Sequence, residues 1–407
     1  MATAESKARG GSTAPSQMSS PGAFPGAGLP PLRVRTLRAL PVRFCIDFGQ
    51  RNAIFLKRPL TARRLAVWAE SFAPVPEPGY DLTHSFNAVP VMTRRPFLVS
   101  YESFLPRFPD DHDHGALARP ALAWLEERLR ASLADDRCVA CLAFSEYARR
   151  QFLKQAASSR HRAAIEAKLR VRYPVMPLRR TTPKPASGEL RLLFVAHRFM
   201  GKGGPALLRA HERLRAAGVP VTTTVVSELA WEHDDYIGPG SQALFERERK
   251  RVAGPGIVHV RSAANARVLE LMEEADYFVL PTFHDTFGYV ALESLAGGTP
   301  VIASATCALP EIVEHGENGY LIPFENDPEV GRWPWIYRRR DPLYDEAYEA
   351  QIARMADSLT DILSEAYETR AGYGERSAAS IERMRSRFDP TAARDELELD
   401  YERCRDW

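Results

Sequence analysis

The stretch from residue 277 to residue 304 constrains the fold of this chain more than any other part of it. Residues 277–280 and 300–303 form two apolar runs, and a proline closes the first and opens the second. Short runs of this kind predict buried strands. Between them, a loop leads into a helical segment that starts near Gly288 and is broken by Gly297. Strand, helix and strand in this order predict two parallel neighbours in an α/β sheet.

Two carboxylates mark this unit, Asp285 in the loop and Glu293 in the helix. The backbone amides of Phe287, Gly288 and Tyr289 begin the helix and are predicted to be open to an anion. One acid at the mouth of the helix, a second acid two turns further on, and free amides between them suit a ligand with hydroxyl and phosphate groups. On its own, an acid pair at this spacing also fits a solvated helix.

The sequence around these acids resembles the donor-binding region of family 4 glycosyltransferases, which have the GT-B fold. The family carries E-x7-E within a longer frame of glycine, leucine, alanine and proline. The residues that fall in register with this frame are Phe287, Gly288, Leu292, Glu293, Ala296, Gly298, Pro300 and Val301. The first acid is Asp285 in place of the family's glutamate, which is one methylene longer. Glu311 falls in the family's P-E-I-V turn, which implies a place on the donor side.

A second loop, between residues 196 and 204, carries cations and glycines between a predicted strand and a predicted helix. Fixed positive charge and free amides at such a place favour an anion. In the resembling family an arginine and a lysine of this loop hold the donor's diphosphate. Lys202 and Gly203 match that pattern, whereas His197 stands at the arginine position with Arg198 beside it, so both remain candidates. Lys202 is otherwise an exposed loop lysine.

Two residues of the first half are candidates for the acceptor side. His84 lies in D-L-T-H and resembles the family's D-x-x-H strand end. Glu102 stands where many members have a histidine that faces the reacting sugar. A carboxylate there would bind an acceptor hydroxyl or take its proton, and a plain loop acid is the alternative interpretation.

Apolar runs and helical patterns alternate along both halves, which predicts an α/β fold. The predicted strands are residues 43–48, 82–85, 96–100, 138–144, 190–196, 221–226 and 257–260, and the predicted helices are 117–133, 146–155, 205–217 and the segments after 344. The resemblance implies two Rossmann-like domains that face each other across a cleft, with a last helix that crosses back. The expected divisions are a disordered segment 1–32, an acceptor-side domain 33–184, a nucleotide-sugar-binding domain 185–385 and a return helix 386–407, with residues 181–188 as linker.

The resemblance implies transfer of a sugar from a nucleotide-sugar co-substrate to a sugar, lipid-linked or small-molecule acceptor, with retention and without a metal. Glu293 would hold the ribose hydroxyls and Asp285 the sugar hydroxyls. Lys202, with Arg198 or His197, would neutralise the leaving diphosphate. Two alternatives stay open. One is an epimerase or phosphorylase of the same architecture, and the other is a catalytically silent protein that binds a nucleotide sugar.

Composition narrows the class of protein and its partners. A net charge of +2 over 407 residues gives no reason to expect nucleic acid. The chain has no apolar run near the ~20 residues of a membrane span and no secretory signal pattern at its N-terminus. Five cysteines, an odd number, indicate a reducing cytoplasm. Nine basic residues against one acid between residues 33 and 64 predict either a solvated surface or a peripheral contact with anionic lipid at the inner face of the membrane.

Three further groups of residues contain side chains of the kinds that form sites. Residues 110–114, D-D-H-D-H, contain metal-ligand types, but a built site draws ligands from separate elements, so a solvated loop is favoured. Cys138 and Cys141 lie in an apolar run and are predicted to be core thiols. The aromatic residues between 333 and 337 precede three arginines, and both acceptor contact and packing against the last helices are open to them.

Overall fold

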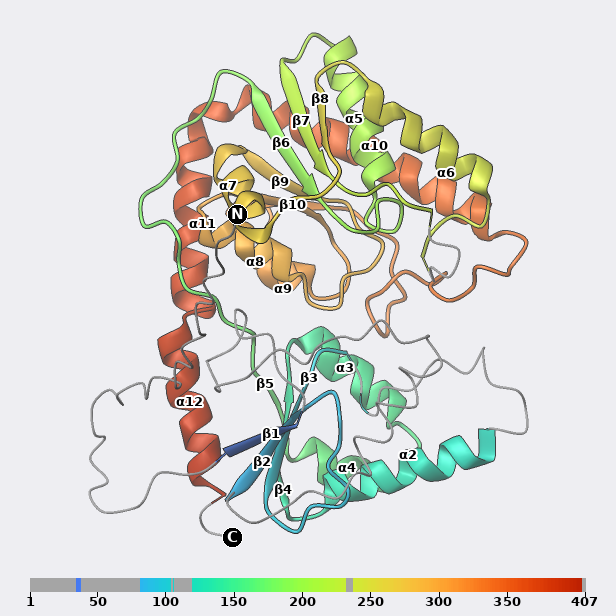
Figure 1. Ribbon diagram of the computed structural model, residues 1–407, viewed down its shortest axis with the longest axis vertical. Coiled ribbons are helices and arrows are strands. Elements are labelled where there is room, and N and C mark those ends of the chain that lie inside the picture. The colour runs from blue at the N-terminus through green and yellow to red at the C-terminus, as the bar shows by residue number, and fades with distance from the viewer. Residues whose placement is uncertain (1–33, 38–80, 104, 106–118, 232–236, 405–407) are drawn as a thin grey trace, which may run out of the picture.

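The computed structural model describes residues 34–37, 81–103, 105, 119–231 and 237–404 (Figure 1). Within these residues the chain forms two parallel sheets, one above the other, each with its own helices. The predicted α/β class and the two Rossmann-like units are confirmed. The division of the chain at residues 33, 185 and 386 stays a prediction.

The second sheet has the strand order of a doubly wound Rossmann sheet. Its order is β11-β10-β9-β6-β7-β8, which counted within this half is 6-5-4-1-2-3. Its strands are β6 (Leu190–Val195), β7 (Val221–Val226), β8 (Ile257–Val260), β9 (Tyr277–Leu280), β10 (Val301–Ser304) and β11 (Gly319–Ile322). The helices along it are α5 (Gly204–Ala216), α6 (Gln242–Arg249), α7 (Asn265–Glu274), α8 (Tyr289–Ala296), α9 (Leu309–Ile312) and α10 (Tyr344–Glu368).

The central strands of this sheet are apolar along their whole length. All four residues of β9 are buried, as are all four of β10. Continuous apolar strands are typical of a parallel sheet with helices on both faces. In the register, Phe278 lies opposite Leu193 of β6 on one side and opposite Val301 of β10 on the other. The predicted strand, helix and strand between residues 277 and 304 are confirmed.

The first sheet follows the order of the chain, from β1 to β5. Its strands are β1 (Val34–Leu37), β2 (Leu82–Phe86), β3 (Phe97–Tyr101), β4 (Cys138–Ala143) and β5 (Leu169–Val171), and its helices are α2 (Arg119–Ala134), α3 (Glu146–Gln155) and α4 (Arg162–Glu166). The carboxyl ends of both sheets point toward each other, and α3 lies beside the first sheet on the side that faces the second domain (Figure 1). The two sheets are therefore joined at the edge where α/β proteins bind ligands.

The chain returns to the first sheet at its end, as predicted. After α11 (Tyr373–Arg387), α12 (Pro390–Glu402) crosses down beside the first sheet (Figure 1). Leu397 and Tyr401 pack there against apolar residues of β2, β3 and β4. The last helix therefore completes the core of the first domain.

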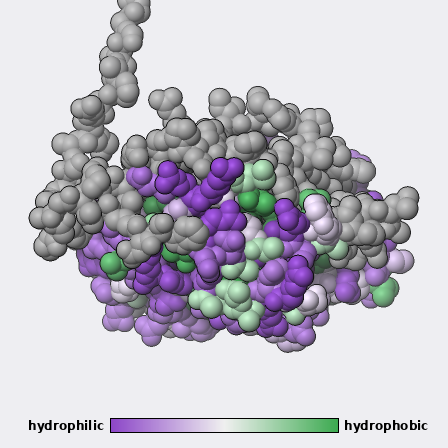
Figure 2. All heavy atoms as spheres, turned by 90° about the horizontal axis from the view of Figure 1, so that it is seen from below, coloured by the Kyte–Doolittle hydropathy of each residue, from purple (hydrophilic) through white to green (hydrophobic). Residues whose placement is uncertain are grey.

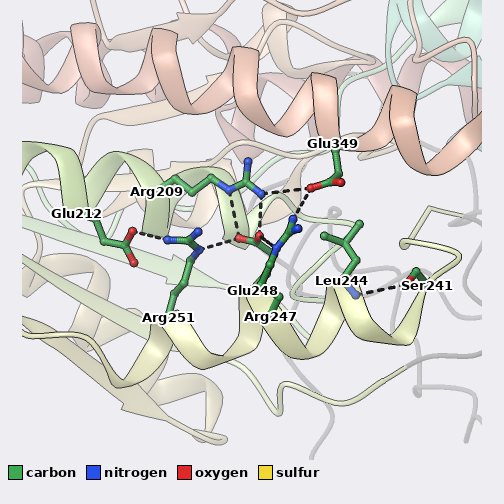
Figure 3. Close-up of polar contacts among 8 residues, drawn as sticks. All are labelled: Arg209, Glu212, Ser241, Leu244, Arg247, Glu248, Arg251 and Glu349. Carbon is green, nitrogen blue, oxygen red and sulfur yellow. Dashed lines mark hydrogen bonds and ion pairs between the residues drawn. The ribbon is translucent and has the colours of Figure 1, made fainter.

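The outer helices of the second domain are tied together by buried charge (Figure 3). The Glu248 side chain is only 1% exposed and accepts hydrogen bonds from Arg209 at 2.7 Å, Arg251 at 2.9 Å and Arg247 at 3.0 Å. Burial acts to raise the pKa of Glu248, but the bonds from Arg209 and Arg247 outweigh it and leave that pKa below its usual value. Arg247 also pairs with Glu349 of α10. This network fixes α6 against α5 and α10.

The proline-rich segment at residues 181–188 is docked on the second domain. The ammonium group of Lys184 donates to Thr299 Oγ1 at 2.9 Å and to the carbonyl oxygen of Ala275. The backbone amide of Lys184 donates to Ser377 Oγ at 2.9 Å. Burial lowers the pKa of Lys184 to about 8. The predicted linker is therefore fixed to the second domain by both the backbone and the side chain of Lys184.

Several predicted features lie outside the described residues. They are the strand at 43–48, nearly all of the basic cluster at 33–64 and the run at 110–114. Cys138 and Cys141 are buried free thiols with sulfur atoms 3.7 Å apart, and the described residues contain no group of three or more candidate metal ligands. The helices and strands that were not predicted include β1, β5, β11, α4, α6, α7 and α9.

Within the part of the chain that the structure describes, no helix is long and apolar enough to cross a membrane. Figure 2 shows the molecule from below, where hydrophobic residues form small groups between hydrophilic ones on the coloured surface.

His84 of β2 is the polar centre of the contact with α12. Its Nε2 lies 2.7 Å from Ser100 Oγ and its Nδ1 lies 2.8 Å from the Tyr401 hydroxyl, with the residue 2% exposed. Burial lowers the pKa of His84 to about 4. In the unfolded chain the pKa is about 6.5, so between pH 6.5 and 4 only the unfolded state takes up the proton. Folding stability must therefore fall as the pH drops through this window.

We predict that His84 costs about 2 kcal/mol of folding stability at pH 5 relative to pH 7.5. Urea unfolding at the two pH values measures it, and His84→Gln should remove most of this difference. The exposed His259 provides the matched control, since His259→Gln should keep the pH dependence of the parent. An unchanged pH dependence in His84→Gln would contradict the assignment.

Candidate functional site

The strand order of the second sheet reverses between β6 and β9, and two loops leave the sheet at this point. The loop after β6 carries Lys202 and Gly203, and the loop after β9 carries Asp285 and Phe287. In doubly wound sheets, ligands bind outside the carboxyl ends of the strands at such a switch point. The structure therefore brings together the two loops that the sequence singles out.

A partly exposed ion pair joins these loops. Lys202 Nζ lies 2.8 Å from Asp285 Oδ2 and also donates to the carbonyl oxygen of His284 at 2.8 Å. The side chains are 26% and 19% exposed, so solvent and a ligand can reach both. The predicted diphosphate cation and the predicted sugar acid thus lie at one point.

Glycine makes the close approach of the loops feasible. Gly203 has a φ of +75°, and a Cβ at this position would lie 1.7 Å from the carbonyl oxygen of Pro281. Gly288, with a φ of +93°, starts α8, and a Cβ there would lie 2.7 Å from Leu309. Any larger residue would push the two loops apart or strain the start of α8.

The other donor-side candidates lie around this pair. Glu293 is on α8 and is 7% exposed, while Phe287 is buried and Tyr289 is partly exposed. His197 is exposed and Arg198 is partly buried, both in the loop of Lys202. The structure leaves both as candidates for the second cation.

An aromatic cluster packs these loops on α10. The Tyr348 ring stacks on Phe283 at 4.6 Å with an interplanar angle of 10°, and its hydroxyl donates to the carbonyl oxygen of Met200 at 2.9 Å. Trp333 meets Phe283 edge to face at 4.7 Å. Trp333 thus packs against the last helices, one of its two predicted outcomes. Tyr348 was not predicted, although Tyr344 and Tyr348 share a helical face in the sequence.

Glu311 contacts the first domain. Its carboxylate accepts the backbone amides of Glu146 at 2.8 Å and Tyr147 at 2.7 Å, at the start of α3, and the Tyr173 hydroxyl at 2.9 Å. The expected donor-side role of Glu311 is untested by this geometry. The contact to α3 was not predicted, because the two segments lie 165 residues apart.

Two residues beside the ion pair were missed in the sequence. The Tyr147 hydroxyl of α3 lies 3.4 Å from Nε2 of His284, the residue directly before Asp285. His284 could have been predicted from its position, because it lies between the end of β9 and Asp285. No sequence pattern indicates Tyr147, because its contact with His284 depends on how the two domains are arranged.

The two acceptor-side candidates have different surroundings. Glu102 follows β3 at the carboxyl edge of the first sheet and exchanges hydrogen bonds of 3.3 Å with Asn87. It therefore lies on the edge that faces the second domain. His84 lies within β2, enclosed by Ser100 and Tyr401 under α12, away from that edge.

Residues 189–331 match the family model described as "Glycosyl transferases group 1". Over these residues the chain is similar to the group 1 glycosyl transferases. The matched range contains the loop of Lys202, the ion pair, α8 and the turn of Glu311.

Curated proteins similar to part of this chain include enzymes that transfer sugars. Glycogen synthase of Mycobacterium tuberculosis (strain ATCC 25618 / H37Rv) is 31% identical over 136 residues, which is 33% of this chain and 31% of that protein. D-inositol 3-phosphate glycosyltransferase of Jonesia denitrificans is 38% identical over 128 residues, 30% of each. The chain therefore spans about a third of the length of these relatives.

Solved structures share the fold over most of the chain. Sucrose-phosphate synthase from Thermosynechococcus elongatus has a TM-score of 0.54 and 18% identity, over 88% of this chain and 82% of that one. Anabaena HepE in complex with UDP and glucose has a TM-score of 0.52 and 16% identity, over 84% of this chain and 81% of its own. The chain thus has the GT-B fold.

The geometry predicts an effect of Asp285 on anion binding. A diphosphate that binds Lys202 must displace the Asp285 carboxylate or lie beside it. In Asp285→Asn the side chain no longer pairs with Lys202 and no longer repels the diphosphate. Affinity for a nucleoside diphosphate should therefore rise several-fold, which matches the roughly 1 kcal/mol that a partly exposed ion pair contributes. Calorimetric titration with a panel of nucleoside diphosphates measures it.

Asp357 supplies the matched control, because it forms an exposed ion pair with Arg213 on the outer helices. Asp357→Asn should leave the affinity unchanged. Weaker binding in Asp285→Asn would mean that the carboxylate supports the anion site instead of competing for it.

Proposed function

We propose that this protein is a glycosyltransferase that moves a sugar from a nucleotide-sugar donor to an acceptor hydroxyl. The observation that carries the proposal is the Lys202–Asp285 pair at the switch point of a domain that matches the group 1 model. The names of the relatives, glycogen synthase and D-inositol 3-phosphate glycosyltransferase, support the reaction class. HepE was solved with UDP-glucose, which supports a nucleotide-sugar donor.

The donor side is assigned to the second domain. Glu293 binds the ribose hydroxyls, Asp285 binds the hydroxyls of the sugar, and the backbone amides at the start of α8 are assigned to the phosphates. Lys202 and either Arg198 or His197 neutralise the diphosphate. Positive charge at the position where negative charge develops lowers the barrier to breaking the bond between sugar and phosphate.

The reaction conserves the anomeric configuration in this proposal. The bond between the anomeric carbon and the diphosphate oxygen breaks, and a bond to the acceptor oxygen forms on the same face of the sugar. The acceptor proton goes to the departing phosphate, and the charge that a metal provides in other transferases comes from Lys202 and its neighbours. These features follow from the family that the sequence resembles.

The acceptor side is assigned to the first domain. Glu102 lies on the carboxyl edge of the first sheet, where it would bind an acceptor hydroxyl or help to take its proton. His84 is enclosed by Ser100 and Tyr401, and we assign it the role of holding α12 on the first sheet.

A second candidate function is a catalytically silent nucleotide-sugar-binding protein. The observation that favours it is Asp285, which is shorter than the family's glutamate and is held by Lys202. Asp285→Glu separates the two functions. In an active enzyme the longer acid should reduce turnover or change the preferred sugar, whereas in a silent protein it should create turnover or leave none.

The cellular setting is proposed as the cytoplasm, with peripheral contact to an anionic membrane. The four cysteines among the described residues are free thiols, as a reducing compartment requires. The basic cluster at residues 33–64 provides the membrane contact.

Glu293→Gln should weaken nucleoside diphosphate binding by about 1–3 kcal/mol, because a charge-assisted hydrogen bond to the ribose is lost. Calorimetry with the nucleotide that binds the parent measures this. Equal nucleotide affinity in Glu293→Gln and the parent would refute the ribose role.

Lys202→Ala should lower kcat by raising the activation free energy by about 2.7–4 kcal/mol, since Lys202 acts on the negative charge that grows as the bond breaks.

Membrane contact has its own prediction. Binding to vesicles that contain anionic lipid should fall steeply between low and physiological salt. Replacing Arg33, Arg35 and Arg38 with glutamine should reduce binding further at each salt concentration. Sedimentation with vesicles measures both, and binding that ignores the fraction of anionic lipid would exclude this contact.

A further inference from the structure

One face of α3 in the first domain is docked on the second domain. Tyr147, Gln151 and Lys154 are spaced by four and three positions and share this face. The Gln151 side-chain amide donates to the carbonyl oxygen of Val330 at 3.3 Å, and Lys154 pairs with Glu329 at 2.7 Å. The contacts thus run along the whole helix from its first turn to its last.

The start of α3 is completed by the other domain. Of its first three amides, those of Glu146 and Tyr147 donate to the two carboxylate oxygens of Glu311, and that of Ala148 donates to Ser145 Oγ at 3.0 Å. A carboxylate stabilises a helix N-terminus by satisfying free amides and by its charge. Separation of the domains would leave two of these amides without their acceptor.

A short chain of contacts leads from α3 to the ion pair. The Tyr147 hydroxyl faces His284 Nε2 at 3.4 Å. The carbonyl oxygen of His284 accepts Lys202 Nζ at 2.8 Å and Thr282 Oγ1 at 2.9 Å, and Asp285 is the next residue. The side chain of His284 therefore faces the first domain while its backbone holds the ammonium group.

We propose that α3 is a positioning element for the Lys202–Asp285 pair, with Tyr147 and His284 as the positioning residues. Tyr147 fixes His284 when the domains are docked, and the His284 carbonyl then fixes Lys202. The catalytic meaning of this arrangement rests on the proposed transferase function, but the physical coupling does not.

The contacts of α3 differ in how much they are expected to stabilise the docking of the two domains. Lys154 and Glu329 are 49% and 72% exposed, so their ion pair contributes little. Gln151 is buried and the Glu311 carboxylate accepts charge-assisted bonds, so these contacts carry more of the docking. Tyr147 differs from these residues in reaching the loop of Asp285, which makes it the position to test.

The test is hydrogen exchange of the ligand-free protein, followed by mass spectrometry, in Tyr147→Phe. The variant keeps the ring and loses only the hydroxyl. Amides of residues 283–286 should exchange roughly fivefold faster, the change expected from one lost hydrogen bond. Tyr101→Phe is the matched control, because Tyr101 is also buried in the first domain and its hydroxyl has no hydrogen-bond partner among the described residues.

Exchange at residues 283–286 that equals the parent in Tyr147→Phe would overturn the proposal. So would an equal acceleration in Tyr101→Phe, because the effect would then be a general loosening of the first domain. Hydrogen exchange needs no substrate, so it tests the physical coupling even if the proposed transferase function fails.

A second readout separates positioning from binding. With a donor that the parent turns over, Tyr147→Phe should lower kcat about tenfold and leave nucleoside diphosphate affinity within about twofold. Equal losses of affinity in Tyr147→Phe and Lys202→Ala would make Tyr147 a binding residue and refute the proposal. Absence of donor binding in the parent would refute the proposed function alone.

Glu311 gives an independent check of the docking. Glu311→Gln should speed exchange of the Glu146 and Tyr147 amides several-fold, since the neutral amide is a weaker acceptor. Glu314→Gln is the control on the same segment, because Glu314 pairs with Arg383 within the second domain. Unchanged exchange at both amides in Glu311→Gln would show that the helix cap does not depend on the other domain.

Discussion

The close approach of two backbones, at Gly203 and Pro281, is the constraint on which the site depends. The loops after β6 and β9 leave neighbouring strands, and only a residue without a Cβ lets them touch. Lys202 and Asp285, 2.8 Å apart, lie on the two loops that this contact brings together. The contact also explains why the aromatic cluster of Phe283 lies directly behind the pair, since the same loop must be supported from the side of α10.

The shorter acid has a local physical meaning. Asp285 reaches Lys202 directly, whereas a glutamate would carry its carboxylate about 1.5 Å further, by one carbon–carbon bond. The ion pair with Lys202 is therefore matched to the side chain that this chain has. The aspartate at position 285, where the resembling family has a glutamate, is therefore accommodated by the positions of the loop and of Lys202.

The sequence predicted what local patterns encode. The apolar runs of β9 and β10 and the start of α8 at Gly288 follow from the run lengths and the glycine, and the loops of Lys202 and Asp285 from residue types at strand ends. Contacts between distant segments could not be predicted, as Tyr147 and His284 are 137 residues apart and neither has a pattern of its own. Composition indicated a linker at residues 181–188 but could not show that the buried Lys184 holds this segment on the second domain, because its partners are distant in the sequence.

The return of α12 to the first sheet has a consequence for the order in which the chain can fold. His84 and Tyr401 meet across 317 positions, and Leu397 covers the apolar face of strands that are made long before α12. At roughly 5–20 residues per second, a ribosome needs some tens of seconds to make the chain between them. During that time α12 cannot yet cover this face. The first domain is thus the first to be made and the last to be finished, and a nascent chain halted before α12 would expose this face to chaperones.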